Sequence, residues 1–466
     1  MKKMKKRMRI SLFLTAVLSA VTLQATAEGF KTAGNGTTYT MKKLLQTEEA
    51  GVKTVNTASE SAGYLLTQND TIAEGDFFVM DDDVRLEFAD GVALVLEGEA
   101  DFRLTKGSTF DMQFDPMSDR EDWKPVGLVI RNSKGIEITN ATFFTVGIQS
   151  MTKGDVTLRN CRFYGNNGVN AAALYFTSAA ESCTVENCLF ERCNRAAIGS
   201  AANASQPMTI RNCTFTENST DNRNIPQINI TAASDIRIED CQLTGYEENT
   251  MVGGIGISNF MSYEDTHALV SRCEITDNRY GITTFGPTDI RIEDCRLTDN
   301  NHETNPMNGG SGISLYDPYG KTTAVIAGNE IERNLWGVTV IGCKEVSLGE
   351  PTSLRVASPG GNVFKDNGFD GERYDLYNNS TLTIYAQNNT WSVISQTEEE
   401  IESVIFHKHD DERLGEVIFM PAAEQTGIRG IEELKDSERI FNLRGMQMDT
   451  CPQRGFYIRN GKKYLR

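Results

Sequence analysis

The chain has 466 residues, of which 39% are hydrophobic and 24% are charged. Its 64 acidic side chains outnumber 46 basic ones, which gives a formal net charge of −18 at neutral pH. Neutralising nucleic-acid phosphates requires a basic surface, so this balance excludes nucleic acid as a partner. The same charge repels a polyanion unless a cation such as Ca²⁺ mediates the contact.

Residues 1–27 are expected to form a secretory signal peptide. A basic start is followed by an apolar stretch from Ile10 to Val21 and by the small-residue cleavage site Ala25-Thr26-Ala27. Its removal leaves 40 basic against 64 acidic side chains, a net charge of −24. No later segment is apolar for long enough to span a bilayer. The chain is therefore expected to be exported to the periplasm, the outer-membrane surface or the medium.

Residues 28–91 are expected to form an N-terminal cap. The stretch 38–51 reads as a short helix and the stretch 70–91 as strands separated by turns. A cap is needed because the first coil of a stacked fold would otherwise expose its core and a row of unpaired backbone groups.

Residues 92–421 are expected to form one stack of coils with its C-terminal cap, and a short sequence pattern recurs within them, as in VTLRNCRFYGN at 156 and DIRIEDCQLT at 235. Alternating apolar residues form one strand, a second strand follows the cysteine, and a third reads like GISLY at 312. This repeating pattern predicts an all-β solenoid of about ten or more coils with three strands each, closed by a C-terminal cap.

Six cysteines mark one position of the coil and follow one another at intervals of 22 to 32 residues. They are Cys161, Cys188, Cys213, Cys241, Cys273 and Cys295, and the position continues as Ala141 before them and as Asn329, Asn362 and Asn389 after them. In-register side chains keep their Cβ atoms about 4.8 Å apart, whereas a disulfide prefers roughly 3.5–4.5 Å. Mostly free, buried thiols are therefore predicted. Cys183 and Cys193 lie outside this file and could still pair.

Asparagine returns five residues after the cysteine position. The six members are Asn166, Asn218, Asn278, Asn300, Asn334 and Asn367. Asparagine tolerates the left-handed conformation of a tight corner, and stacked amides can hydrogen-bond along the solenoid. The constant spacing predicts an asparagine ladder.

Long insertions follow the asparagine corner at 219, 246 and 301, on nearby coils. Loops rising on the same side would gather possible acid/base pairs and a cation for an oxyanion or a uronate, with Arg279 on the short corner between them. The candidate catalytic residues are Asp221, Arg223, Glu247, Arg279, His302 and Glu303, with Glu248 beside them. The alternative is that these are the ordinary charges of solvated loops.

Four aromatic residues lie at or just after the end of the third strand, where exposed rings could stack against sugars. These candidate substrate-binding residues are Tyr175, Phe285, Tyr316 and Tyr319; alternatively, they pack under loops. His407 and His409, with Asp410 and Asp411, hint at a metal, although a charged capping turn is the favoured interpretation. The metal is unknown, and Ca²⁺ is the one cofactor left open.

The coils resemble those of right-handed parallel β-helix repeat proteins of the pectate lyase-like superfamily, over about residues 92–397. After a linker at 422–438, the tail at 439–466 (FNLRGMQM, then GFYIRNGKKYLR) is similar to C-terminal sorting-type β segments of exported Bacteroidota proteins. The resemblance implies a right-handed single-stranded β-helix, and export machinery as a partner through the tail. The activities that the resemblance implies are those of polysaccharide lyases, hydrolases or epimerases, although the superfamily also contains members of no known activity.

The family's catalytic series do not carry over to this chain. The NTD, DD, GHG and RIK series of polygalacturonase-like members is missing from the coils, as is the Asp-Pro-His-Asp signature of alginate epimerases. The expected function is an exported protein that acts on or binds a polysaccharide, with lyase- or hydrolase-type chemistry in a groove over one sheet. The alternative is a non-catalytic surface adhesin or scaffold, and whether the protein is an enzyme stays open.

Overall fold

The computed structural model describes residues 29–55, 62–113, 126–166, 172–201, 204, 206–231, 234–259, 266–305, 309–349 and 357–423, and the backbone of four short strands between 440 and 465. The predicted signal peptide and most of the predicted linker lie outside these residues. The chain divides into two units, 1–423 and 424–466.

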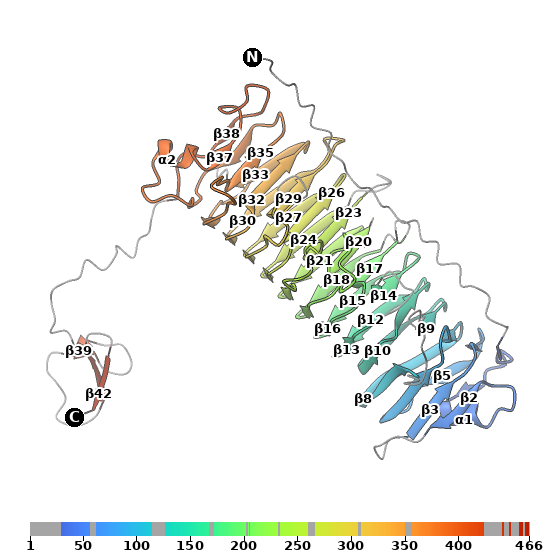
Figure 1. Cartoon of the computed structure of the whole chain (residues 1–466). Coiled ribbons are helices and arrows are strands. Elements are labelled where there is room, and N and C mark those ends of the chain that lie inside the picture. The colour runs from blue at the N-terminus through green and yellow to red at the C-terminus, as the bar shows by residue number, and fades with distance from the viewer. Residues whose placement is uncertain are drawn as a thin grey trace. The chain divides into compact units, whose positions relative to one another are not determined.

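The first unit is a parallel β-helix with three strand-bearing faces (Figure 1). One 25-stranded sheet forms the first and second faces, and a 13-stranded sheet forms the third. Almost every strand pairs in parallel with its counterpart one coil away, as β21 does with β24 and β22 does with β25. The all-β, parallel β-helix fold predicted from the sequence is confirmed.

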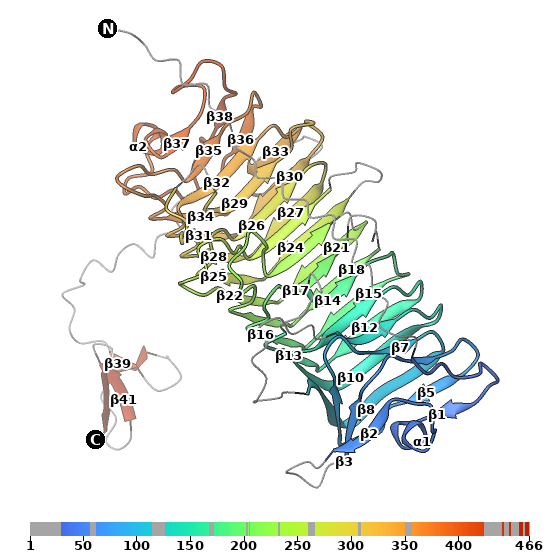
Figure 2. The same ribbon diagram turned by 45° about the vertical axis from the view of Figure 1, so that its right-hand side comes forward.

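The strands stack in chain order along each face (Figure 2). The first face contains β12 (Asp155–Arg159), β15 (Cys183–Glu186), β18 (Met208–Arg211), β21 (Asp235–Glu239), β24 (His267–Ser271), β27 (Asp289–Glu293), β30 (Thr323–Ala327), β33 (Glu345–Gly349), β36 (Ile384–Ala386) and β38 (Val417–Ile418). The second contains β3 (Ala62–Leu66), β6 (Val84–Phe88), β13 (Arg162–Tyr164), β16 (Leu189–Glu191), β19 (Thr214–Thr216), β22 (Gln242–Thr244), β25 (Glu274–Thr276), β28 (Arg296–Thr298), β31 (Glu330–Glu332) and β34 (Val363–Lys365). Two long strands, β8 (Glu99–Met112) and β10 (Gly135–Phe144), run through both faces.

The third face carries the candidate site. Its strands are β4 (Asp70–Ile72), β7 (Ala93–Leu96), β9 (Gly127–Ile130), β11 (Gly147–Ser150), β14 (Ala172–Phe176), β17 (Ala196–Ser200), β20 (Ile228–Thr231), β23 (Ile255–Ser258), β26 (Ile282–Phe285), β29 (Ser311–Tyr316), β32 (Trp336–Ile341), β35 (Leu376–Asn378) and β37 (Ile405–Phe406).

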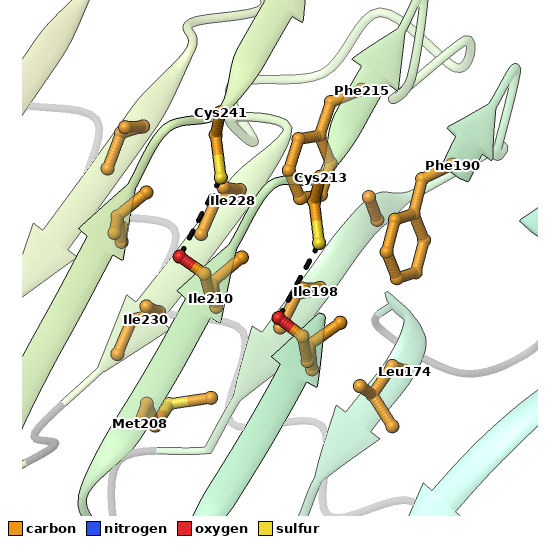
Figure 3. Close-up of a cluster of buried hydrophobic side chains, with 14 of the residues drawn as sticks. Leu174, Phe190, Ile198, Met208, Ile210, Cys213, Phe215, Ile228, Ile230 and Cys241 are labelled. Carbon is orange, nitrogen blue, oxygen red and sulfur yellow. Dashed lines mark hydrogen bonds between the residues drawn. The ribbon is translucent and has the colours of Figure 1, made fainter. Parts of the chain in front are cut away.

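The core consists of inward side chains that stack on their counterparts in the next coil. Phe163, Phe190 and Phe215 form part of a column of rings whose centroids are 4.7 and 5.1 Å apart. Around them lie isoleucine, leucine and cysteine side chains with at most a few per cent of their surface exposed (Figure 3). Such files follow from period-2 alternation in strands that share one register.

The corner between the first and second faces explains the cysteine file. The residue before each cysteine of the file has a positive φ, for example 54° at Asn160. The thiol then forms hydrogen bonds with backbone groups near the corner. Cys188 Sγ accepts from Cys161 N at 3.4 Å, and Cys241 Sγ donates to Ile210 O at 3.7 Å (Figure 3). Asn329 has the same role, because its Oδ1 accepts from Cys295 N at 2.9 Å.

The asparagine ladder is confirmed over Asn278, Asn300, Asn334 and Asn367. The Nδ2 of Asn300 donates to Asn334 Oδ1 at 2.9 Å and its Oδ1 accepts from Asn278 N at 3.2 Å. The left-handed residue, however, is the one before each asparagine, such as Asp277 with φ 55°. The amides thus satisfy the corner rather than adopt its conformation.

Two positions of the asparagine ladder are filled by other residues. Gln227, at the start of the third strand, bridges Asn218 and Asn278 with hydrogen bonds of 3.0 Å each. Cys193 occupies the asparagine position of its own coil, and its N–H donates to Asn218 Oδ1 at 3.1 Å. Cys193 and Cys183 are both free and buried, so they do not pair.

Short elements close both ends of the first unit. At the N-terminal end lie β1 (Thr38–Tyr39), α1 (Met41–Leu45), β2 (Val52–Val55) and β5 (Phe77–Val79), and at the C-terminal end lies α2 (Glu398–Glu402). Parallel pairing already reaches into the segment that the sequence assigns to a cap, because β4 pairs with β7 and β3 with β6.

The second unit is a four-stranded antiparallel sheet. Its strands are β39 (Ile440–Phe441), β40 (Gln447–Met448), β41 (Phe456–Arg459) and β42 (Lys462–Leu465). Among the described residues, no helix has the length and apolar character needed to cross a bilayer.

The thiols provide a first test of the core. All nine described cysteines are free, and each is at most 4% exposed. We expect at least nine reactive thiols in the unreduced chain under denaturing conditions, counted with a chromogenic thiol reagent. These same nine should not react quickly in the native protein, because burial excludes the reagent. Fewer than nine thiols after denaturation would contradict the free-thiol core.

The ladder provides a second test. Asn300→Ala removes hydrogen bonds to Asn334, Asn278 and the Ile275 carbonyl. Leaving such buried groups unpaired should lower the free energy of unfolding by about 3 kcal/mol. The control is Asn301→Ala, since that exposed amide makes one side-chain hydrogen bond, to Arg333 O. Denaturant unfolding should show a far smaller loss for the control, and equal losses would contradict the role of the ladder.

Candidate functional site

From Thr71 to Phe406 the third face carries a continuous outward file of side chains without a single charge; the neighbour of Thr71 in the coil before is Lys31, which pairs with Glu97. Register links one outward residue of each strand to the next, while its strand neighbours point inward, as Ile228 and Ile230 do beside Asn229. We call it the outer file. Its members are Thr71, Val95, Val129, Gln149, Tyr175, Gly199, Asn229, Gly256, Thr283, Ser314, Thr339, Tyr377 and Phe406.

From Gly199 to Thr339 the outer file holds only glycine, hydroxyl and amide side chains. A second, shorter outward file beside it is also uncharged: Thr231, Ser258, Phe285, Tyr316 and Ile341. The strip from Gly199 to Thr339 offers side-chain hydrogen-bonding groups at Asn229, Thr283 and Ser314, which are half-buried. Glycine takes its place at 199 and 256, where Pro226 lies over Gly256, and Thr339 is 6% exposed with its hydroxyl bonded to Ser311.

The other two faces differ because they carry charged ladders between coils. Arg159 on the first face pairs with Glu137 and with Glu186, the latter at 3.0 Å. On the second face, Lys365 pairs with Glu330 at 2.6 Å. The outward charges of the described strands thus lie on the first and second faces, because the one charged residue in a third-face strand, Asp70, is buried.

An aromatic group stands at the C-terminal end of the outer file. The ring centroids of Trp336 and Tyr377 are 4.4 Å apart, as are those of Tyr377 and Phe406, and both pairs are stacked. Tyr374 packs edge-on against all three rings. Each of the four is partly exposed. The sequence does not reveal this group because its members come from three strands and a corner. They meet only because β32, β35 and β37 pair in register across successive coils.

The four aromatic residues predicted as a platform do not form one surface. Phe285 and Tyr316 are neighbours, with centroids 5.2 Å apart. Tyr175 is only 7% exposed because Ile225 from a loop packs over it, and this burial raises the pKa of its hydroxyl. Tyr319 is 57% exposed in the turn after β29. Two of the four therefore lie together on the third face.

The first two long insertions do lie together at the border of the third face. Asn222 accepts from Met251 N at 2.9 Å and donates to Glu248 O at 3.3 Å. The first insertion also folds over the sheet. A Cβ added to Gly256 would stand 2.7 Å from Pro226 Cγ, so only glycine fits beneath this proline.

Asp221 and Arg223 are brought together, but as partners in an ion cluster. The Asp221 carboxylate lies 3.1 Å from Arg195 Nε and 3.2 Å from Arg223 Nε. Burial raises the pKa of the Asp221 carboxyl, and the two guanidinium groups oppose that rise. This arrangement ties the first insertion to the preceding corner.

Arg279 lies beneath the loops with only 7% of its surface exposed. Its Nη1 donates to Asn224 Oδ1 at 2.8 Å and approaches Met251 O at 3.5 Å. The guanidinium therefore anchors both insertions, and its predicted role as a cation for a substrate stays a prediction.

His302, which belongs to the third insertion, lies near Glu247 of the second insertion. Burial lowers the pKa of the His302 ring, and the Asp277 and Glu247 carboxylates oppose this shift. Glu303 accepts a hydrogen bond from Asn305 N at 2.9 Å. Across the described parts of the chain, no hydrogen bond or ion pair joins His302 or Glu247 to the Asp221 cluster. The predicted catalytic set is therefore divided into separate groups.

Glu402, His407 and His409 form the one described cluster with potential metal-ligand atoms, all within 4.8 Å of one another. His407 Nδ1 accepts a hydrogen bond from Val417 N at 2.8 Å, so Nε2 carries the ring proton and donates to Glu402 Oε1 at 2.7 Å. A metal at Nε2 would need that proton removed while Nδ1 still accepts a hydrogen bond. The group therefore fits a capping turn better than a metal site.

The asparagine ladder ends on a buried carboxylate behind the aromatic group. Asp375 is fully buried and accepts from Asn367 Nδ2 at 3.0 Å, Ser392 N at 2.8 Å and Ser392 Oγ at 2.6 Å. Burial raises the pKa of this carboxyl to about 6, although the hydrogen bonds oppose the shift.

Comparison with known proteins identifies one family. The model described as "right handed beta helix region" matches residues 86–243 and 224–391, about two thirds of the chain. No curated protein sequence matches.

Among solved structures, the periplasmic alginate epimerase AlgG is 12% identical, covers 82% of this chain and 76% of its own, and has a TM-score of 0.37. A single-site mutant of that enzyme is also 12% identical, covers 82% and 83%, and has a TM-score of 0.39. Likenesses this distant carry no assignment of activity or substrate.

Asp375 gives a prediction on pH. Its raised pKa means that the folded state holds a proton more tightly than the unfolded state, so its stabilisation is complete below about pH 4 and is lost as the pH rises through about 6. The loss should reach about 3 kcal/mol by neutral pH. The difference in free energy of unfolding between the native chain and Asp375→Asn should therefore shrink from pH 4 to pH 7.

The control for this pH test is Asp370→Asn, at an exposed turn with φ 51°, which asparagine also adopts. Urea unfolding of this variant should keep the pH profile of the native chain. A profile unchanged in Asp375→Asn as well would contradict the raised pKa.

Proposed function

The chain belongs to the family of right-handed β-helix proteins, and on that fold we propose that it binds a polysaccharide along the outer file of its third face. Stacked coils repeat the same backbone position along one axis, which suits a ligand that is itself a linear polymer. The described face is regular from β17 to β32 and is bordered by the two interlocked insertions.

The single observation that carries the proposal is the combination of the aromatic group with the uncharged strip of the outer file. Sugars are bound by hydrogen bonds to their hydroxyls and by packing of their C–H faces against aromatic rings. Trp336 stacks on Tyr377 and stands beside Thr339, where the strip of small side chains ends. One ligand strand could therefore use both kinds of contact.

We propose binding rather than cleavage as the activity. A lyase or hydrolase requires an acid/base set within reach of one bond. The predicted set instead contains Asp221 held between two arginines, Arg279 engaged with Asn224, and His302 in a separate group. These contacts support a role in shaping the loops, and processing of the glycan stays a prediction.

The proposal includes export. It is supported by the signal-peptide pattern of residues 1–27 and by the tail at 439–466, which resembles a sorting-type segment. A mature chain with a net charge of −24 would remain soluble among extracellular or periplasmic glycans.

Trp336→Ala should weaken polysaccharide binding at least about tenfold, because an aromatic–sugar contact contributes energy of the order of an aromatic pair plus buried area. The control is Tyr164→Ala, since this ring is 38% exposed on the second face, away from the outer file. The measurement is retention on a polysaccharide array, with and without Ca²⁺, for variants whose thermal unfolding matches the native chain.

Equal binding by both folded variants would contradict the proposed face. Release of soluble products from a retained polysaccharide, abolished by Glu247→Gln with His302→Gln, would establish processing in place of simple binding.

A further inference from the structure

The absence of charge on the outer file bears on the kind of glycan that fits it. A polyanionic glycan presents a carboxylate or sulfate at regular intervals, and each must be matched by a cation or remain hydrated. The thirteen residues of the outer file include no lysine or arginine, and neither does the shorter file from Thr231 to Ile341.

The cations at the border of the third face are already engaged within the protein. Arg195 and Arg223 share the Asp221 carboxylate, at 3.1 and 3.2 Å. Arg279 is 93% buried and donates to Asn224. A ligand anion would have to displace these contacts before Arg195 or Arg279 could reach it. Arg223 is 64% exposed, but it belongs to the first insertion and not to the outer file.

A bridging cation does not resolve the mismatch. Ca²⁺ requires several oxygen ligands with negative charge among them. The outer file has no carboxylate, and Asp221 at its border is neutralised by two arginines. The chain's large negative charge adds long-range repulsion of any polyanion.

The same strip is well equipped for uncharged sugars. The amide of Asn229 is half-buried and makes no hydrogen bond within the described part of the chain, so both its donor and its acceptor are available. Thr283 uses its hydroxyl only to donate to Ser314 O at 3.3 Å, which leaves its oxygen free to accept. Two coils farther on, the strip ends at Thr339, whose hydroxyl is bonded to Ser311 Oγ at 2.7 Å, and the ring of Trp336 follows in the aromatic group.

We infer that the ligand of the third face is a neutral glycan, recognised between Asn229 and Trp336 without Ca²⁺; this inference rests on the proposed function. The ligand class follows from the distribution of charge on this face alone. A uronate or sulfated polymer is excluded from this strip because the strip offers neither a free cation nor a set of metal ligands.

The first experiment compares ligands on the full exported chain. Neutral probes are cellulose, xylan, glucomannan and a β-1,3-glucan; anionic probes are polygalacturonate, alginate and a sulfated galactan. At least one neutral polysaccharide should bind with an affinity that changes less than about twofold between low and physiological salt, with EDTA or with Ca²⁺. Anionic polymers should bind at least about tenfold more weakly, and least at low salt, where repulsion is unscreened.

The second experiment places a charge on the strip. Thr283→Asp should weaken binding of the neutral glycan at least about tenfold, because a sugar packed there would desolvate the new carboxylate. The matched control is Thr209→Asp, at an equally half-buried outward position of β18 on the first face, and it should bind as the native chain does. Thermal unfolding confirms that both variants are folded.

The outcomes separate the inference from the function beneath it. Binding of an anionic polymer in preference to every neutral one would overturn the inference and leave polysaccharide binding intact. Neutral binding that is equally affected, or equally unaffected, by Thr283→Asp and Thr209→Asp would overturn both the inference and the proposed face. Binding to no polysaccharide at all would overturn the proposed function itself.

Discussion

The structure depends on one constraint: at the described corners of the cysteine and asparagine files, a buried backbone N–H is satisfied by a side chain of the next coil. Left-handed residues such as Asn160 and Asp277 turn the chain, and the following N–H would be buried without a partner. A side chain from the next coil supplies the acceptor, either a thiol as in Cys188 or an amide as in Asn300. The cysteine and asparagine files are therefore two versions of the same hydrogen-bonding device.

This device also shapes the third face. The ladder amides need room beside the start of each third strand, and a Cβ on Gly312 would stand 3.0 Å from Asn334 Nδ2. Glycine or a ladder partner such as Gln227 or Asp375 therefore opens these strands, which then continue in regular register. The other two faces carry cross-coil ion pairs, whereas the outer file of the third face is uncharged from Gly199 to Thr339.

The sequence predicts the fold well because the spacing of the files directly reflects the register between coils. It misses Gln227, since this residue enters the ladder from a strand start and not from the corner where asparagine recurs. It misses the aromatic group, since Trp336, Tyr377 and Phe406 meet only through pairing across coils of unequal length. Spacing also cannot reveal that Asp221 and Arg279 hold the loops in place, so the sequence leaves catalytic groups and ordinary loop charges as open alternatives.

The ladder has a direction, and this direction has a consequence for how the solenoid assembles. From Asn278 to Asn367 each amide donates toward the carboxyl end, and the series finishes on Asp375. A stack that is interrupted between two of these layers therefore leaves an amide donor at its last layer without its acceptor. Asp375 ends the series, because a carboxylate accepts the last of these hydrogen bonds and offers no N–H of its own.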